Sequence, residues 1–181
     1  MKIKTIILML KIKIYEKLLH RDVMELKIER YRMEGATIGN HVRAFSPISS
    51  GEPYLISIGD DVTISTGVRF CTHDNSAIKC IPGATDFVGP IKIGRNVFIG
   101  MNTILLGGIE LGDNCIVGAG SIVTKSFREP GSIIAGNPAK IIGNAENLCM
   151  KNGAKAFNFR GMSASMKKQE IMKNSEKWIR K

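Results

Sequence analysis

Aliphatic residues recur every six positions through the second half of the chain, and a glycine follows most of them. A period of six matches neither the 3.6-residue period of a helix nor the two-residue alternation of an ordinary strand. It is typical of a coil of short stacked parallel strands, with three hexads in a turn of about eighteen residues. The repeat is carried by Ile93, Ile99, Leu105, Leu111, Val117 and Val123, with Gly94, Gly100, Gly112 and Gly118 behind four of them.

The period also predicts which side chains meet inside such a coil. Residues eighteen positions apart should stack, which places Ile93 under Leu111, and likewise Ile99 under Val117 and Leu105 under Val123. The compact residues four positions after each aliphatic should also point inward: Val97, Thr103, Ile109, Cys115, Ser121 and Phe127. The corners need unusual backbone angles, for which asparagine and glycine are suited. We expect them at Asn96, Gly107, Gly108 and Asn114.

Earlier copies of the repeat begin at Ile38, Ile58, Ile64 and Phe70, and then the period breaks. Residues 72–90 hold prolines and glycines that a six-residue repeat cannot absorb, so they predict a projecting loop, where binding groups are often found. The predicted fold class is an all-β solenoid with helical caps. We divide the chain into an N-terminal cap (1–35), a β-helix domain (36–143) with loop 72–90, and a tail (144–181).

Both ends show helical spacing of apolar residues. Ile3, Ile7, Leu10, Ile14 and Leu18 suit one face of a helix, although residues 11–14 alternate as in a strand. We favour an amphipathic helix that caps the solenoid. In the tail, Met166, Ile171, Ser175, Trp178 and Ile179 predict a terminal amphipathic helix.

Charge is concentrated at the two ends. The net charge of +10 divides into +4 for residues 1–35 (nine basic, five acidic), zero for 36–143 (eight of each) and +6 for 144–181 (nine and three). The neutral centre lacks the basic, aromatic-rich face of a nucleic-acid binder, so we expect no nucleic-acid partner. Basic ends suit anionic lipid, an acidic polymer or a phosphorylated ligand, and solvated ends are the simpler alternative.

The sequence shows neither a membrane span nor a signal peptide, so we expect a cytoplasmic protein. The apolar run at residues 6–10 is too short to cross a bilayer, and Lys11 and Lys13 interrupt any signal-peptide core. Peripheral membrane contact through the basic ends stays open. The four cysteines lack metal-binding spacing, so we expect reduced thiols, no metal, and Cys115 as a small buried side chain.

Three stretches, residues 91–100, 118–125 and 136–140, resemble the hexapeptide-repeat acyltransferases with left-handed β-helix folds, most closely the maltose and galactoside O-acetyltransferases. The motif from Thr72 to Asn75 is similar to acetyltransferases that modify bacterial surface polysaccharides. The resemblance implies a left-handed coil, acetyl-coenzyme A as donor, and a homotrimer with active sites between subunits. Both ends of the chain depart from the maltose-type pattern.

Acetyl transfer to a hydroxyl needs a base that is unprotonated near neutral pH, and histidine suits this role. Of the three histidines, His73 begins the predicted loop and matches the family motif, whereas His20 and His41 have no comparable context. Asp74 is a second candidate, with three alternative roles: orienting His73, contacting the acceptor, or capping the loop backbone. Cys71, two residues before His73, raises a covalent mechanism, which the directly transferring relatives disfavour.

The donor would need small residues and cations along the coil wall. Gly100, Gly118 and Ala119 fall at the family positions that contact coenzyme A. Lys125 and Lys140 are the cations placed by motif to meet its phosphates, with Thr124 and Asn137 as weaker candidates.

Together these features predict an O-acetyltransferase acting on a sugar hydroxyl, in surface polysaccharide biosynthesis. An N-acetyltransferase acting on an amino sugar needs the same base and stays open, as does a non-catalytic β-helix scaffold. A γ-type carbonic anhydrase is disfavoured because its zinc needs three histidine ligands, and His41 and His73 lie far apart in sequence.

Overall fold

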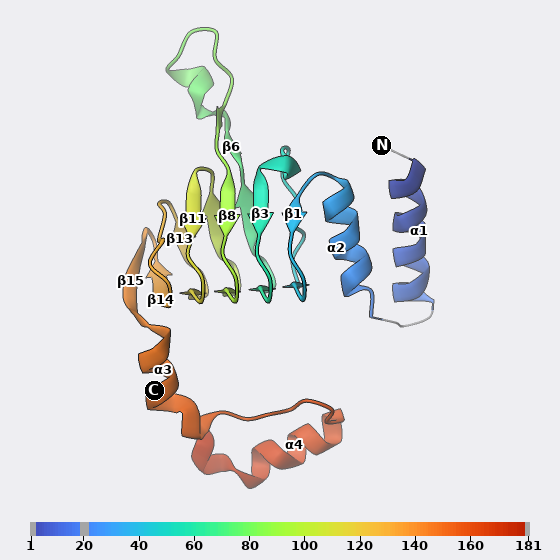
Figure 1. Ribbon diagram of the computed structural model, residues 1–181, viewed down its shortest axis with the longest axis vertical. Coiled ribbons are helices and arrows are strands. Elements are labelled where there is room, and N and C mark those ends of the chain that lie inside the picture. Colours follow the sequence, from blue (N-terminus) through green and yellow to red (C-terminus); the bar gives the residue numbers. More distant parts are fainter. Residues whose placement is uncertain (1–2, 19–21, 180–181) are drawn as a thin grey trace.

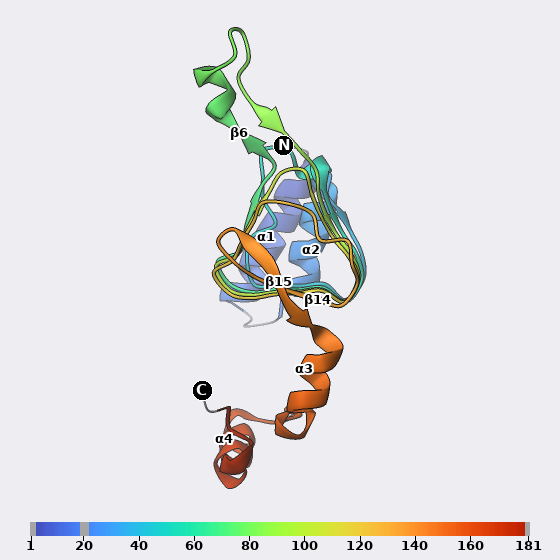
Figure 2. The same ribbon diagram turned by 90° about the vertical axis from the view of Figure 1, so that its left-hand side faces the viewer.

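The computed structural model describes residues 3–18 and 22–179. Successive strands belong in turn to three different sheets, so the chain winds as a three-sided coil, seen along its axis in Figure 2. Pairing between successive coils is parallel. The first sheet contains β1 (Thr37–Ile38), β3 (Ile56–Ile58), β8 (Ile91–Ile93) and β11 (Ile109–Leu111).

The other two sides of the coil are built in the same way. One contains β5 (Arg69–Cys71), β10 (Ile104–Leu106) and β13 (Ile122–Val123). The other contains β2 (Arg43–Ala44), β4 (Thr63–Ile64), β9 (Phe98–Ile99), β12 (Ile116–Val117) and β14 (Ser132–Gly136), closed by the antiparallel strand β15 (Ala139–Asn144).

The predicted stacking is confirmed residue by residue. Ile93 pairs with Leu111, and the pairs Ile99–Val117 and Leu105–Val123 follow the same eighteen-residue offset. All six side chains are at most 4% exposed, so the columns form the core of the coil. The six compact positions between them are buried as well.

The corners use positive φ angles at Asn96 (53°), Gly108 (87°) and Asn114 (61°), as predicted. The expectation for Gly107 was wrong, because its φ lies outside the left-handed region. Glycine instead allows a close approach there: a Cβ on Gly107 would lie 3.1 Å from the carbonyl oxygens of both Thr72 and Gly89, a tight contact.

Residues 72–90 project from the coil (Figure 1). Their two arms form a short antiparallel pair, β6 (His73–Asp74) with β7 (Phe87–Val88), and a turn of 3₁₀ helix, η2 (Asn75–Lys79), follows β6. Ile104 pairs with Ile122, 18 positions later, but with Arg69, 35 positions earlier. The projecting segment is therefore an insertion that leaves the coil register intact on both sides.

Two helices precede the coil. In α2 (Met24–Met33), Ile28 and Tyr31 join the core cluster of the coil, so this helix closes its end. The helix α1 (Ile3–Lys17) packs on α2 through Leu8 and Ile12. The strand alternative for residues 11–14 was wrong, and the cap is made by α2 rather than by the apolar stripe of α1, because that stripe faces away from the packed side.

The tail leaves the coil at the end opposite α1 and α2 (Figure 1). It holds α3 (Ala145–Asn152), α4 (Ala164–Lys173) and two short 3₁₀ turns, η3 (Gly153–Lys155) and η4 (Ser175–Lys177). A further 3₁₀ turn, η1 (Pro53–Leu55), directly precedes β3. The predicted terminal helix ends earlier than expected, since the chain leaves the helical conformation at Asn174. Trp178 lies beyond it and donates its indole N–H to the carbonyl oxygen of Ile171. In the described part of the chain, no helix is long and apolar enough to cross a membrane.

Candidate active site

His73 lies where the coil gives way to the projecting segment. Strand β5 ends at Cys71, the next residue Thr72 is 1% exposed, and His73 then pairs with Val88 across the foot of the hairpin. The buried Thr72 before it and its own pairing with Val88 fix the backbone of His73. Its side chain is 45% exposed and therefore accessible to a ligand.

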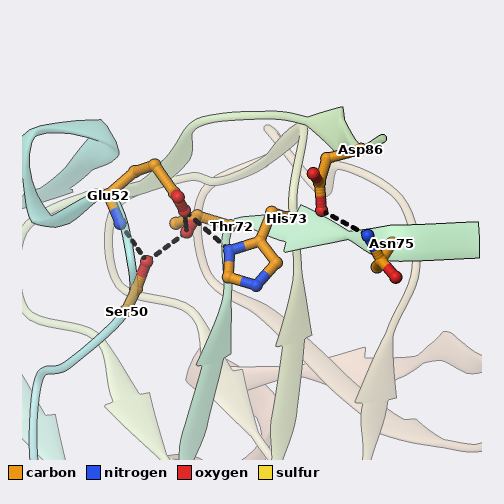
Figure 3. Close-up of polar contacts among 6 residues, drawn as sticks. All are labelled: Ser50, Glu52, Thr72, His73, Asn75 and Asp86. Atoms are coloured by element: carbon orange, nitrogen blue, oxygen red, sulfur yellow. Dashed lines mark hydrogen bonds and ion pairs between the residues drawn. The ribbon is translucent and has the colours of Figure 1, made fainter. Parts of the chain in front are cut away.

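Glu52 holds the imidazole from a distant segment of the chain. Its Oε2 lies 2.8 Å from Nδ1 of His73 (Figure 3). The same oxygen accepts a 2.7 Å hydrogen bond from the Thr72 hydroxyl, which in turn accepts one from Ser50. The Ser50 hydroxyl accepts from the backbone N–H of Glu52 at 3.0 Å. These three hydrogen bonds form a closed ring that holds the Glu52 carboxylate in place beside the histidine.

This ring sets the protonation state of the pair. The Thr72 hydroxyl first, and His73 second, lower the pKa of Glu52, so its carboxylate is ionised and only accepts. Nδ1 of His73 must then carry the hydrogen, which leaves the lone pair of the neutral ring on Nε2. The hydrogen bond to Glu52 and the charge of Glu52 raise the pKa of His73 above its ordinary value. Nε2 faces away from Glu52 (Figure 3).

Sequence reasoning did not identify Glu52 as the partner of His73. It lies in the irregular stretch before β3, where no period or motif links it to a residue 21 positions later. Gly51 beside it was missed too. A Cβ on Gly51 would lie 3.1 Å from Cε1 and 3.3 Å from Nδ1 of His73, so the imidazole packs against a backbone without a side chain.

Asp74 is engaged with the backbone of the projecting segment. Its Oδ1 accepts a 2.9 Å hydrogen bond from the N–H of Ser76, which caps η2 and lowers the pKa of Asp74. Of the roles considered for Asp74, the capping contact is therefore present, and Glu52 is the residue that contacts the imidazole. Asn75 donates to the carbonyl oxygen of Thr85 and to Asp86, which joins the two arms of the hairpin (Figure 3).

A groove of about 620 Å³ runs past the imidazole, between the foot of the hairpin and the corner after β10. Both polar and apolar groups line it, which suits a ligand with hydroxyl groups and carbon faces. Its lining residues are Cys71, Thr72, His73, Asp74, Asn75, Phe87, Val88, Gly89, Leu106, Gly107 and Gly108.

Of the cations predicted to meet a donor, Lys125 lies along the same edge of the coil as His73. Leu106 pairs with Cys71, and Val123 pairs with Leu105, so Thr124 and Lys125 leave β13 at the corner where His73 follows β5. Two strand spacings separate these positions, about 10 Å. Lys125 and Lys140 line a common groove of about 400 Å³.

The small residues predicted for the donor lie at a different corner. Gly118 and Ala119 follow β12, and Gly100 lies one coil below them. A Cβ on Gly100 would be 2.5 Å from the backbone nitrogen of Ala119, and Gly100 is buried, so coil stacking alone requires this glycine. Asn137 is exposed in the turn between β14 and β15. The predicted site residues therefore lie at two corners: Thr124 and Lys125 at the corner where His73 follows β5, and Gly100, Gly118, Ala119 and Asn137 at the other. Lys140 pairs with Ala135 beside the second corner and lines a groove with Lys125.

Of the remaining histidines, His41 occupies a coil corner with a φ of 56° and lies 3.2 Å from Asp61. His20 lies outside the described residues. Cys115 is fully buried, and burial raises the pKa of its thiol, as expected of a small core residue.

The coil and its repeats define a hexapeptide-repeat protein, and the sequence profile described as the hexapeptide repeat of succinyl-transferase matches residues 90–125. Protein CapG of Staphylococcus aureus is 45% identical over 140 residues, which cover 74% of this chain and 78% of that protein. Galactoside O-acetyltransferase of Escherichia coli (strain K12) is 33% identical over 106 residues, 58% of this chain and 52% of that protein. The chain belongs to the hexapeptide-repeat acetyltransferase family and is an acyltransferase.

Solved structures of this family share the fold. A galactoside acetyltransferase in complex with coenzyme A superposes with a TM-score of 0.61 at 23% identity, over 89% of this chain and 86% of that one. A maltose O-acetyltransferase from Clostridium difficile 630 gives 0.54 at 24% identity, over 78% and 84% of the two chains.

Proposed function

We propose that this chain is an acetyl-coenzyme A dependent O-acetyltransferase that acts on a sugar hydroxyl in surface polysaccharide biosynthesis. The observation that carries the proposal is the His73–Glu52 pair, which directs an unprotonated Nε2 away from Glu52 on a side chain that lines the groove. Membership of the acetyltransferase family and the likeness to protein CapG and to galactoside O-acetyltransferase support the reaction class.

In the proposed mechanism, Nε2 of His73 removes the proton of the acceptor hydroxyl as its oxygen attacks the thioester carbonyl of acetyl-coenzyme A. The ionised Glu52 stabilises the imidazolium that results, through Nδ1–H. When the tetrahedral intermediate collapses, the carbon–sulfur bond breaks and the imidazolium returns the proton to the leaving thiolate. Acetylated sugar and coenzyme A leave, and His73 is neutral again.

The donor is proposed to meet both groups of predicted residues. Lys125 and Lys140 attract its phosphates. Thr124, next to Lys125, and Asn137, three residues before Lys140, are weaker candidates for contact with the donor. Gly118 and Ala119, supported from below by Gly100, offer a wall without large side chains. Because these groups occupy different corners of one coil, a homotrimer supplies them together: one corner from each of two neighbouring subunits encloses each site. The left hand of the coil belongs to the same proposal and follows from the family.

The cellular setting is part of the proposal. The enzyme acts in the cytoplasm, where acetyl-coenzyme A is available, and its basic ends hold it near an anionic membrane surface that carries the acceptor. The division into cap, β-helix domain and tail agrees with this arrangement, since both basic segments lie outside the coil.

The reaction is tested by measuring coenzyme A release from acetyl-coenzyme A against a panel of nucleotide-linked and free sugars, each in a hydroxyl and an amino form. We expect release with hydroxyl sugars and an ester product that mild alkali removes. Release confined to amino sugars, with an alkali-stable amide, would establish the N-acetyltransferase alternative. A chain that neither binds coenzyme A by calorimetry nor releases it with any sugar would be a scaffold.

Gly51 provides a sharper test of the imidazole position. We expect Gly51→Ala to lower kcat by about tenfold, because the new methyl group displaces the His73 ring from its productive orientation by a few tenths of an ångström. The matched control is Gly153→Ala, where a Cβ would meet open space. Coenzyme A release by the two variants is compared with the unmodified protein. Equal rates for all three would show that the ring position is not critical.

A further inference from the structure

The outward face of α1 is apolar and is not covered by any other described part of the chain. Ile3, Ile7, Leu10 and Ile14 follow one another at three- and four-residue spacing and are between 49% and 76% exposed. The opposite side of the helix, with Leu8 and Ile12, is the one that packs on α2. The exposed stripe continues into Leu18, which is 73% exposed.

Lysines border this stripe on both sides. At 100° per residue, Lys13 and Lys17 lie along one edge, and Lys4 and Lys11 lie along the other. All four are exposed. The one acidic residue of α1, Glu16, lies outside the stripe and pairs with Lys27 of α2 at 2.7 Å. The outward face therefore combines a continuous apolar strip with positive borders.

This combination matches an anionic lipid surface better than a second protein chain. Lysine side chains at the borders of an apolar strip can place their methylenes against acyl chains and their ammonium groups among phosphates. A second copy of α1 would bring the same lysines together, and their like charges would repel. One side of α1 is held by α2, so the helix would lie in the plane of the interface.

We propose that α1 is an interfacial membrane-binding helix whose Ile3–Leu18 stripe inserts into an anionic bilayer. Since α1 is the outermost element at one end of the coil (Figure 1), binding would attach the whole molecule by that end. This inference gives the membrane contact of the proposed function a specific structural element. The insertion itself depends on α1, whereas its purpose, access to a membrane-borne glycan, rests on the proposed function.

The test uses the full chain and sedimentation with vesicles of phosphatidylcholine containing about one third phosphatidylglycerol. We expect the protein to sediment with these vesicles and Ile7→Ser/Leu10→Ser to lower the partition coefficient by at least about tenfold. Lys4→Gln/Lys11→Gln should lower binding to anionic vesicles and leave the weaker binding to pure phosphatidylcholine unchanged. Met172→Ser, a matched control on α4 that is 60% exposed, should bind like the unmodified protein.

Coenzyme A binding by calorimetry is measured on every variant, so that failure of the proposed function is distinguished from failure of this inference. All variants should bind coenzyme A equally, because α1 lies apart from the coil corners assigned to the donor. Full sedimentation of Ile7→Ser/Leu10→Ser would overturn the proposal. So would a protein that ignores vesicles but forms, in analytical ultracentrifugation, an assembly that Ile7→Ser/Leu10→Ser dissociates, since the stripe would then cover a second copy.

Discussion

His73→Ala is expected to lower kcat by about 10²- to 10⁴-fold, the range that a positioned general base contributes. The substitution removes the nitrogen that accepts the acceptor proton and later returns it to the thiolate. Binding of acetyl-coenzyme A should be unchanged, because the groove with Lys125 and Lys140 does not include His73. Coenzyme A release under saturating substrates, together with calorimetry, measures the two effects separately.

His41→Ala is the matched control for this loss, since His41 also pairs with a carboxylate but lies at a different coil corner. It should retain activity. The assembly state of both variants should equal that of the unmodified protein in analytical ultracentrifugation. Near-normal turnover by His73→Ala would refute the assignment of the base and would direct attention to Cys71, which lines the same groove.

Glu52→Gln should have the second largest effect, a loss of about 10²-fold in kcat. A glutamine retains the size of the side chain, but it is uncharged and can donate to Nδ1 through its amide. The imidazole would then carry its hydrogen on Nε2, the wrong nitrogen for accepting a proton. The loss of negative charge also removes the stabilisation of the imidazolium.

The pH dependence separates this role from a purely structural one. The base must be unprotonated, so kcat/KM rises as the pH increases through the pKa of His73. Glu52 raises that pKa, so the midpoint of the rise should lie above the ordinary value of about 6.5 in the unmodified protein. In Glu52→Gln the midpoint should move to lower pH, towards that ordinary value.

Asp61→Asn is the control for this shift, because it removes a carboxylate beside His41 and leaves the His73 pair intact. Its pH profile should overlay that of the unmodified protein. A Glu52→Gln profile with reduced height and an unmoved midpoint would mean that Glu52 stabilises the local structure without tuning the base.

Local pattern was sufficient to predict much of the coil. The inward positions follow from a six-residue period, and each of the three predicted stacking pairs has the predicted partner. His73 was also accessible to sequence reasoning, because the break in the repeat and the loop residues after it mark a change in structure within a few positions. Gly107 is an exception: its small size suits the close backbone of Thr72 and Gly89, neighbours in space that no local pattern reveals.

The partner of His73 could not be predicted in this way. Asp74 is adjacent in sequence, but its carboxylate turns to the backbone of Ser76, whereas Glu52 reaches the imidazole from before β3. That contact depends on how an irregular segment folds back onto the coil, and irregular segments carry no periodic signal. The same holds for Gly51, whose missing side chain matters only because the His73 ring lies against it.

The sequence by itself determined the coil, its core and the place of His73 at the break in the repeat, since a repeated local pattern forces the same inward and outward choice in every turn. The tertiary structure alone decided which acid contacts His73, how the residues predicted to meet the donor divide between two corners, and which side of α1 stays exposed. Those features arise from contacts between residues distant along the chain. Such contacts are selected by packing and hydrogen bonding in the folded molecule, and a helical spacing of apolar residues does not say which face a neighbour will cover.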